Sequence, residues 1–285
     1  LYILNSKITA ADPNYGGYAF GVGNAKEFVM KNSEVQYAGF CFQTDFPGGL
    51  SVLATNATIE NNTFTHNYRA ICVATMAGWV QYPPFVTIAN NTISHSYDGI
   101  VYDIGDVLGN TVSKIIHAGV FGSISGQIWR QYYFLANNNI TQVWTGAIML
   151  NWTEGTWVMN NAISSSDIGV LLLSRVANAR VTNNTILNCT KGICLFPGSN
   201  GTLIYHNNII NSPNSCDYGS NNWDYNGEGN YWSDYTDIDK DGDGIGDTHY
   251  SIPPNGIDHY PFMKPNGWIL RAVIINPPVS YTHLT

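Results

Sequence analysis

The stretch Val181–Phe196, VTNNTILNCTKGICLF, is the clearest copy of a unit that recurs along most of the chain. The unit has an Asn pair, a short β-prone segment and a polar turn, and then a Gly followed by a second apolar segment. Taking the second Asn of each copy as a marker places the copies at residues 62, 91, 110, 139, 161, 184 and 208. A repeat with a period of about 20–30 residues indicates a solenoid.

The unit is built of strands rather than helices. Its apolar segments have the length of strands, and alternate residues point to the same side. In Gly192–Leu195, for example, Ile193 and Leu195 share one face and Cys194 takes the other. A unit of roughly 22 residues is too short for two helices but long enough for three short strands. The sequence therefore predicts an all-β fold, a right-handed single-stranded parallel β-helix of about eight or nine coils stacked about 4.8 Å apart.

We expect each marker Asn to lie directly over the Asn of the next coil. Asn tolerates the left-handed backbone conformation of a tight corner, and its side-chain amide can bond to the amide above it. The recurring Gly of each unit is expected at a second corner for the same conformational reason.

The chain divides into three parts. Residues 1–217 carry the repeat and are expected to form the β-helix, whereas residues 218–265 are rich in Gly, Asp and aromatic residues and predict a loop-rich, calcium-binding cap. Residues 266–285 are expected to be a linker or the truncated start of another segment. Because no initiator Met or signal peptide is present, we expect a part of a larger multidomain surface protein.

The composition restricts the classes of function. Charged residues make up 11% of the chain and the net charge is −8, so no basic stripe is available to neutralise the phosphates of a nucleic acid. No run of 18 apolar residues occurs, which argues against a membrane span. The abundance of Asn, Thr and Tyr over Lys is typical of an extracellular, cell-surface or periplasmic protein.

An acidic loop in the predicted cap has the spacing of a calcium site. Residues 239–247 fit the pattern D-x-D-x-D-G-x-x-D, and oxygen ligands at alternate positions of a tight loop suit Ca²⁺. Tyr250 stands where a twelfth-position Glu would be expected, so Asp237 or water is expected to complete the shell. The predicted ligands of this structural ion are Asp237, Asp239, Asp241, Asp243, Asp247 and the carbonyl of Ile245.

Two of the five cysteines occupy equivalent places in adjacent predicted coils. Cys41 and Cys72 each lie two residues after a corner position, and the coil spacing would bring their Cα atoms within reach of a disulfide. The alternative is a stack of two small side chains. The pairing of Cys189, Cys194 and Cys216 stays open.

The predicted cap carries a recognisable signature. Its segments Asn222–Asp224, Gly229–Tyr235, Asp241–Asp247 and Asp258–Pro261 resemble the carboxy-terminal signature of NosD-type β-helix proteins. With the coils, the resemblance covers roughly residues 30–265. It implies a surface-associated β-helix similar to carbohydrate-binding and sugar-hydrolase solenoids, and for some members a periplasmic copper-processing role.

Copper requires clusters of His, Cys or Met. His66 and His95 each follow their marker Asn by four places and are expected to stack on successive coils. Stacked turn residues explain this pair equally well, and no Met cluster or CxxC motif accompanies it. The resemblance therefore favours the fold more than a copper function, and we expect copper to be unlikely.

An enzyme acting on polysaccharides needs acid–base groups on one exposed face. The candidates are Asp98, Asp103 and Asp106, with Arg69 on the coil below and His117 on the coil above. An ordinary cross-strand ion pair between Arg69 and Asp98 is the alternative. Because no hydrolase-type Asp-Asp or Gly-His-Gly motif is present, the sequence favours a protein without catalytic activity.

Exposed aromatic rings stack on the apolar faces of sugars. The candidate rings are Trp79, Tyr82, Trp129, Tyr132, Trp144, Trp152 and Trp157. Packing of some of these rings under loops is the alternative. Our interpretation from the sequence is an extracellular module that binds polysaccharide or glycoprotein glycans, or serves a structural role at the cell surface. The alternatives are a polysaccharide lyase, hydrolase or epimerase, and a NosD-like periplasmic copper-processing accessory protein.

Overall fold

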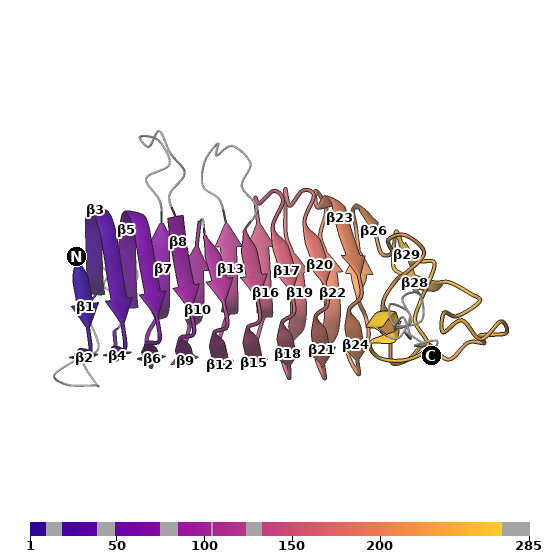
Figure 1. Ribbon diagram of the computed structural model, residues 1–285, viewed down its shortest axis with the longest axis horizontal. Coiled ribbons are helices and arrows are strands. Elements are labelled where there is room, and N and C mark those ends of the chain that lie inside the picture. Colours follow the sequence, from indigo (N-terminus) through magenta and orange to yellow (C-terminus); the bar gives the residue numbers. More distant parts are fainter. Residues whose placement is uncertain (10–18, 39–48, 75–84, 104, 124–132, 270–285) are drawn as a thin grey trace, which may run out of the picture.

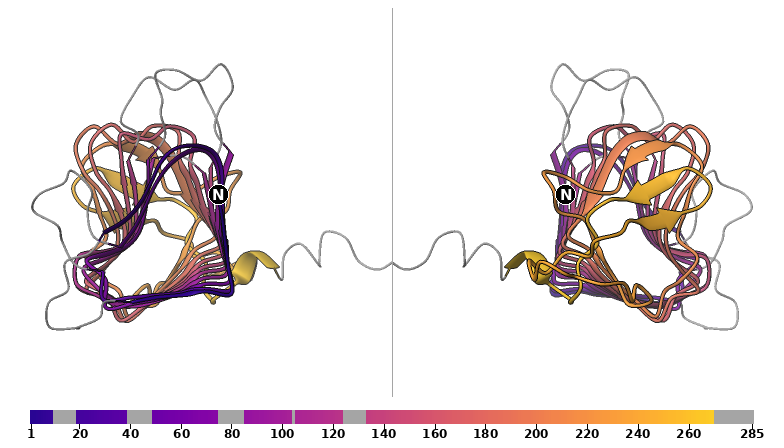
Figure 2. Two further views of the ribbon diagram at one scale, coloured as in Figure 1. Left: turned by 90° about the vertical axis from the view of Figure 1, so that its left-hand side faces the viewer. Right: turned by 90° about the vertical axis from the view of Figure 1, so that its right-hand side faces the viewer.

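The computed structural model describes residues 1–9, 19–38, 49–74, 85–103, 105–123 and 133–269. In these residues the chain winds into a right-handed parallel β-helix whose strands stack along one axis (Figure 1). Seen along that axis, the coils superpose in a roughly triangular outline (Figure 2). The all-β parallel solenoid predicted from the repeat is confirmed.

Each regular coil contributes one strand to each of three faces. The first face is the ten-stranded sheet of β2 (Lys7–Thr9), β4 (Glu34–Gln36), β6 (Thr63–Thr65), β9 (Thr92–Ser96), β12 (Thr111–Ile115), β15 (Asn139–Val143), β18 (Ala162–Ser164), β21 (Thr185–Leu187), β24 (Asn208–Ile210) and β27 (Tyr231–Trp232). The second face comprises β8 (Phe85–Ala89), β11 (Asp106–Leu108), β14 (Phe134–Ala136), β17 (Trp157–Met159), β20 (Arg180–Thr182), β23 (Asn200–Tyr205) and β26 (Ser220–Asn222). The third comprises β7 (Arg69–Ala74), β10 (Asp98–Tyr102), β13 (Ala118–Ser123), β16 (Gly146–Asn151), β19 (Ile168–Leu172), β22 (Lys191–Leu195) and β25 (Cys216–Asp217).

The second and third faces are joined at the amino-terminal end by long strands. β5 (Gly49–Glu60) pairs with β7 through its first half and with β8 through its second half. β3 (Ala19–Lys31) pairs along β5, and β1 (Tyr2–Leu4) pairs with the end of β3. A short antiparallel hairpin in the cap, β28 (Tyr250–Ile252) and β29 (Gly256–Asp258), lies at the other end. No helix in the described ranges is long and apolar enough to cross a membrane.

The core is built from side chains of equal register in successive coils. One inward column on the third face consists of Ile71, Ile100, Val120, Ile148, Val170 and Ile193, all fully buried. Burying each such side chain stabilises the fold by about 1.5–3 kcal/mol. Ile193 and Leu195 share the inward face as predicted, but Cys194 on the outward face is buried as well. It belongs to a second apolar cluster with Met149 and Leu171.

The two residues of each Asn pair have separate tasks. The first takes the left-handed backbone conformation, with φ of 57° at Asn61 and 56° at Asn183. The second turns inward, and its Oδ1 accepts hydrogen bonds from the backbone N–H and the side-chain Nδ2 of the corresponding Asn in the preceding coil, at 3.0 and 2.9 Å for Asn184. This buried Asn ladder consists of Asn62, Asn91, Asn110, Asn138, Asn161, Asn184, Asn207 and Asn230.

Two of the predicted marker positions differ by one residue from the observed ladder positions. The ladder positions are Asn138 and Asn207, not Asn139 and Asn208. The corner explains the shift, because a left-handed residue directly precedes the ladder Asn in every coil from Asn62 to Asn207. In these coils that residue is Asn137 or His206, both with φ of 58°.

The ladder ends on a carboxylate. Asp258 Oδ2 accepts hydrogen bonds from Asn230 N at 2.8 Å and from Trp232 Nε1 at 2.9 Å. Asp258 is completely buried, and its burial raises its pKa to about 6. The stacking of strands thus continues through β26 and β27, beyond residue 217, where the sequence predicted the β-helix to end and the cap to begin. The buried side chains of Trp223 and Trp232 close this end of the core.

Candidate functional site

Arg69, Asp98 and His117 come together at the beginning of three successive strands of the third face: Arg69 starts β7, Asp98 starts β10, and His117 directly precedes β13. Asp98 Oδ2 lies 2.9 Å from Arg69 Nε, and Asp98 Oδ1 lies 2.8 Å from His117 Nδ1. The Asp98 side chain is only 4% exposed, whereas Arg69 and His117 are partly exposed. The ion pair between Arg69 and Asp98, which the sequence analysis gave as the alternative, is confirmed. Asp98 contacts His117 through Nδ1, so the Nε2 atom of this ring is not engaged by Asp98.

The other predicted acid–base candidates lie apart from this cluster. Asp103 follows the far end of β10, where its backbone N–H bonds to Val73 O. Asp106 begins β11 on another face and accepts a hydrogen bond from Phe134 N at 3.0 Å. Burial raises the pKa of Asp106, and the hydrogen bond from Phe134 opposes that rise. Of the acid–base candidates, the structure therefore brings together Arg69, Asp98 and His117.

A column of stacked rings runs beside the ion cluster. Tyr68 and Tyr97 have centroids 5.0 Å apart, and Tyr97 and His117 have centroids 5.5 Å apart, with nearly parallel planes. Rings stacked along the solenoid axis cover each other's faces and present their edges to solvent. Since sugars stack on ring faces, this column is poorly suited to hold a glycan chain.

Three of the seven predicted glycan-binding aromatics lie in the described residues. Trp144 is 75% exposed, but Arg175 lies 4.1 Å over the Trp152 ring and Arg180 lies 4.6 Å over the Trp157 ring. Trp79, Tyr82, Trp129 and Tyr132 lie outside the described residues. The described rings do not form one platform, because Trp144 precedes β16 and Trp152 follows it.

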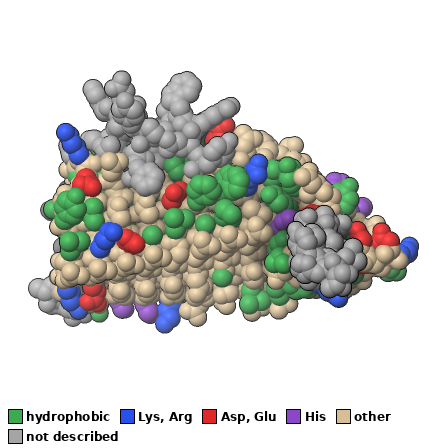
Figure 3. Space-filling model, in the orientation of Figure 1, with side chains coloured by type: hydrophobic (Ala, Val, Ile, Leu, Met, Phe, Trp, Pro, Cys, Tyr) green, Lys and Arg blue, Asp and Glu red, His purple; other side chains and the backbone are tan. Residues whose placement is uncertain are grey.

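His66 and His95 stack on adjacent coils as predicted. Their ring centroids are 4.9 Å apart and their planes differ by 7°. Tyr37 covers the other face of His66, with centroids 5.0 Å apart. Both histidines are exposed at left-handed corner positions, and Figure 3 shows histidine side chains on the lower edge of the solenoid near β6 and β9.

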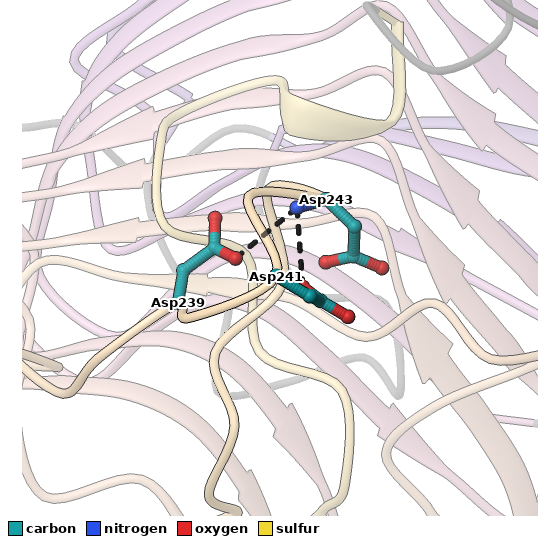
Figure 4. A group of neighbouring side chains, drawn as sticks. All are labelled: Asp239, Asp241 and Asp243. Carbon is teal, nitrogen blue, oxygen red and sulfur yellow. Dashed lines mark hydrogen bonds between the residues drawn. The ribbon is translucent and has the colours of Figure 1, made fainter.

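The acidic loop folds so that three carboxylates converge. Oxygen atoms of Asp239, Asp241 and Asp243 lie within 4.8 Å of one another (Figure 4). Asp239 accepts hydrogen bonds from the backbone N–H groups of Gly242 and Gly244 at 2.7 and 2.9 Å. Burial pushes the pKa of Asp239 upward, but these N–H groups outweigh it and lower the pKa overall.

The remaining predicted calcium ligands are engaged elsewhere in the loop. Asp237 accepts hydrogen bonds from the Thr248 hydroxyl and from Ile238 N, and these bonds lower its pKa. Asp247 Oδ2 accepts a hydrogen bond from Lys240 N at 3.1 Å. Ile245 forms an antiparallel bridge with Phe262, which ties the loop to the rest of the cap.

The predicted Cys41–Cys72 disulfide is wrong. Cys72 is a free thiol, and the residue beside it in the neighbouring strand is Ser51; Cys41 lies outside the described residues. The disulfide in the described residues joins Cys194 to Cys216, which are paired in register on β22 and β25. Cys189 is a buried free thiol.

Sequence reasoning missed a pocket of about 490 Å³ between the last coil and the cap. Its lining comes from parts of the chain that are far apart in the sequence: Lys191, residues 213–216 and Tyr218, Asp234, residues 250–251 and residues 253–254. One available signal was the step of 23 residues from Asn184 to Asn207 and again to Asn230. This step places the cap directly against the last coil.

Comparison with known proteins identifies the family. Residues 48–237, two thirds of the chain, match the family model described as "Periplasmic copper-binding protein (NosD)". The "Probable ABC transporter binding protein NosD" of Pseudomonas aeruginosa is 36% identical over 58 residues, which cover 20% of this chain and only 13% of that relative. The family description favours the copper-related alternative over the glycan-binding interpretation. The chain belongs to the NosD family of parallel β-helix proteins.

Proposed function

We propose that this protein is a NosD-type accessory protein that handles copper outside the cytoplasm, in the periplasm or at the cell surface. We further propose that His66 and His95 form its copper contact. The observation that carries this proposal is the pair of parallel, exposed imidazoles inside the segment that matches the family model. Imidazole is a suitable ligand for copper, and two rings on adjacent coils can serve one ion.

The spacing of the two rings fits a shared ion. Two imidazole nitrogens on one metal lie at most about 4 Å apart, because each metal–nitrogen bond is about 2.0 Å. The ring centroids of His66 and His95 are 4.9 Å apart, so the two exposed side chains would rotate to bring one nitrogen of each ring to a shared ion. Ser94 Oγ lies 3.2 Å from His95 Nδ1, which leaves Nε2 of His95 as the ligand atom.

Local electrostatics affects this pair in two opposite ways. Partial desolvation lowers the pKa of His95, and the charges of Lys114 and His66 lower it further, so the neutral, metal-binding form prevails at neutral pH. The positive charge of Lys114 also repels a bound cation.

Two imidazoles make an incomplete site. Among the described residues, the group of three or more His, Cys or acidic side chains able to share an ion is in the acidic loop, not beside His66 and His95. Water or a ligand from a partner protein would fill the other positions. An incomplete, exposed site suits an accessory protein that receives an ion and passes it on.

Copper titration of the full chain tests the proposal. We expect His66→Gln and His95→Gln each to weaken Cu²⁺ binding at least tenfold, and Lys114→Gln to strengthen it because a positive charge that disfavours a cation at His95 is removed. His259→Gln is the matched control, because His259 is exposed but paired with Asp224 in the cap. Equal affinities for the wild type and both pair variants would overturn the assignment.

Glycan binding is a second candidate, supported by Trp144. This ring is 75% exposed and the neighbouring Ile116 is 55% exposed, so an apolar surface is available for a sugar ring. A glycan array comparing the wild type with Trp144→Ala tests it: retention of every bound glycan by the variant would reject the site.

We also propose that the acidic loop holds a structural Ca²⁺ ion, since its carboxylates converge within a tight turn.

A further inference from the structure

The pocket at the end of the solenoid has fixed walls. On one side, Cys216 is held to the preceding coil by its disulfide with Cys194. On the other side, the segment after β28 is tied to Asp217, which donates its N–H to Pro253 O at 2.9 Å and accepts from Asn255 N at 3.1 Å. A pocket of about 490 Å³ lies within the size range of small-molecule sites.

The pocket contains a cation and an anion that do not neutralise each other. Lys191 takes part in none of the ion pairs found among the described residues. Asp234 is held by the Tyr250 hydroxyl, which donates to its two oxygens at 3.0 and 3.2 Å. Burial, then the charge of Asp234 and this hydrogen bond, raise the pKa of Tyr250, so its hydroxyl remains a donor at neutral pH.

The other lining groups are apolar rings and small polar side chains. Tyr218 is 50% exposed and meets Phe196 edge-on, and Tyr250 has one face stacked on Trp232 at 4.2 Å. Three prolines and the polar Asn214, Ser215 and Ser251 complete the lining. Ring faces and prolines suit the C–H surface of a sugar, and an ionised carboxylate is a strong acceptor for hydroxyl groups.

We propose that this pocket binds an acidic sugar residue, a hexuronate. Its carboxylate would pair with Lys191, its hydroxyls would donate to Asp234, and its apolar face would rest on Tyr218. A neutral sugar would leave the ammonium group unpaired, and an organic acid without hydroxyl groups would leave Asp234 with the Tyr250 hydroxyl as its donor and no donor from the ligand. The site is independent of the copper proposal, because it lies at the opposite end of the solenoid from β6 and β9 (Figure 1).

Ligand-observed NMR of the full chain with glucuronate and glucose tests the site. We expect glucuronate to bind at least tenfold more tightly than glucose, since a hydrogen bond to a charged group is worth about tenfold or more. Lys191→Gln should remove this preference and Lys191→Arg should retain it to within about threefold. Lys114→Gln, on the other half of the solenoid, is the control and should change nothing.

Equal binding of the two sugars, or an unchanged preference in Lys191→Gln, would overturn the assignment. So would the absence of glucuronate binding at tens of millimolar. Circular dichroism melting curves of each variant separate loss of binding from loss of fold.

Discussion

Replacing Asn184 with Ala removes one rung of the ladder on which the solenoid depends. Asn184 is completely buried in the middle of the regular coils. Its Oδ1 accepts two hydrogen bonds from Asn161, and its Nδ2 donates to Asn207 Oδ1, Val158 O and Thr182 O at 2.9, 2.9 and 3.1 Å. We predict that Asn184→Ala lowers the free energy of unfolding by about 3–5 kcal/mol.

The magnitude follows from which partners survive the substitution. Asn161 Nδ2 keeps its bond to Leu135 O, and Asn207 Oδ1 keeps its bond from the backbone N–H of residue 184. The backbone N–H of Asn161 loses the side-chain acceptor that it has in the wild type. One buried unsatisfied group costs about 1–3 kcal/mol, and the other lost bonds add about 2 kcal/mol together.

Asn183→Gly is the matched control, one residue earlier in the same corner. Asn183 is exposed and has a φ of 56°, a conformation that Gly adopts without strain, so the free energy of unfolding should change by less than about 1 kcal/mol. Urea denaturation followed by circular dichroism measures both variants. If Asn184→Ala were no more destabilising than Asn183→Gly, the ladder would not hold the coils together.

Three further predictions concern the cap and the last coils. Because the pKa of Asp258 rises from 3.8 to about 6 on folding, the folded state binds the proton more tightly, and the contribution of Asp258 to stability falls by about 3 kcal/mol as pH rises from about 4 to above 6. Urea titrations at pH 4 and 7 should show this dependence in the wild type but not in Asp258→Asn. Chelation of Ca²⁺ should lower the melting temperature of the wild type but not of Asp239→Asn. An unchanged wild-type melting temperature would contradict the proposal that the acidic loop holds a structural Ca²⁺ ion. Cys194→Ala with Cys216→Ala opens a loop of 22 residues and should destabilise the protein by about 3 kcal/mol in urea, whereas Cys189→Ala should leave that disulfide in place.

The periodic part of the fold could be predicted because, in a β-helix, residues that are one repeat apart in the sequence become neighbours in adjacent coils. The stack of His66 on His95 and the ion pair of Arg69 with Asp98 both follow from that relation. The one-residue errors at 139 and 208 arose where several polar residues adjoin and the pattern does not say which one turns inward. The backbone decides, since the left-handed corner must come first.

The cysteines show where coil spacing is insufficient. Cys41 and Cys72 are separated in the sequence by about the length of one coil. The long strand β5, which continues across two faces, nevertheless places Ser51 beside Cys72. Cys194 and Cys216 are also one coil apart and do form a bridge. The step of 23 residues from Asn207 to Asn230 indicates that the cap lies against the last coil. The pocket itself was not predictable, because its walls in the cap depend on contacts that do not repeat.

X-ray diffraction at the copper absorption edge, from crystals of the full chain grown with Cu²⁺, tests the functional account most directly. We expect an anomalous difference peak within bonding distance of the His66 and His95 rings that is absent in crystals of His95→Gln. A peak elsewhere on the molecule, with none at the histidine pair, would contradict it.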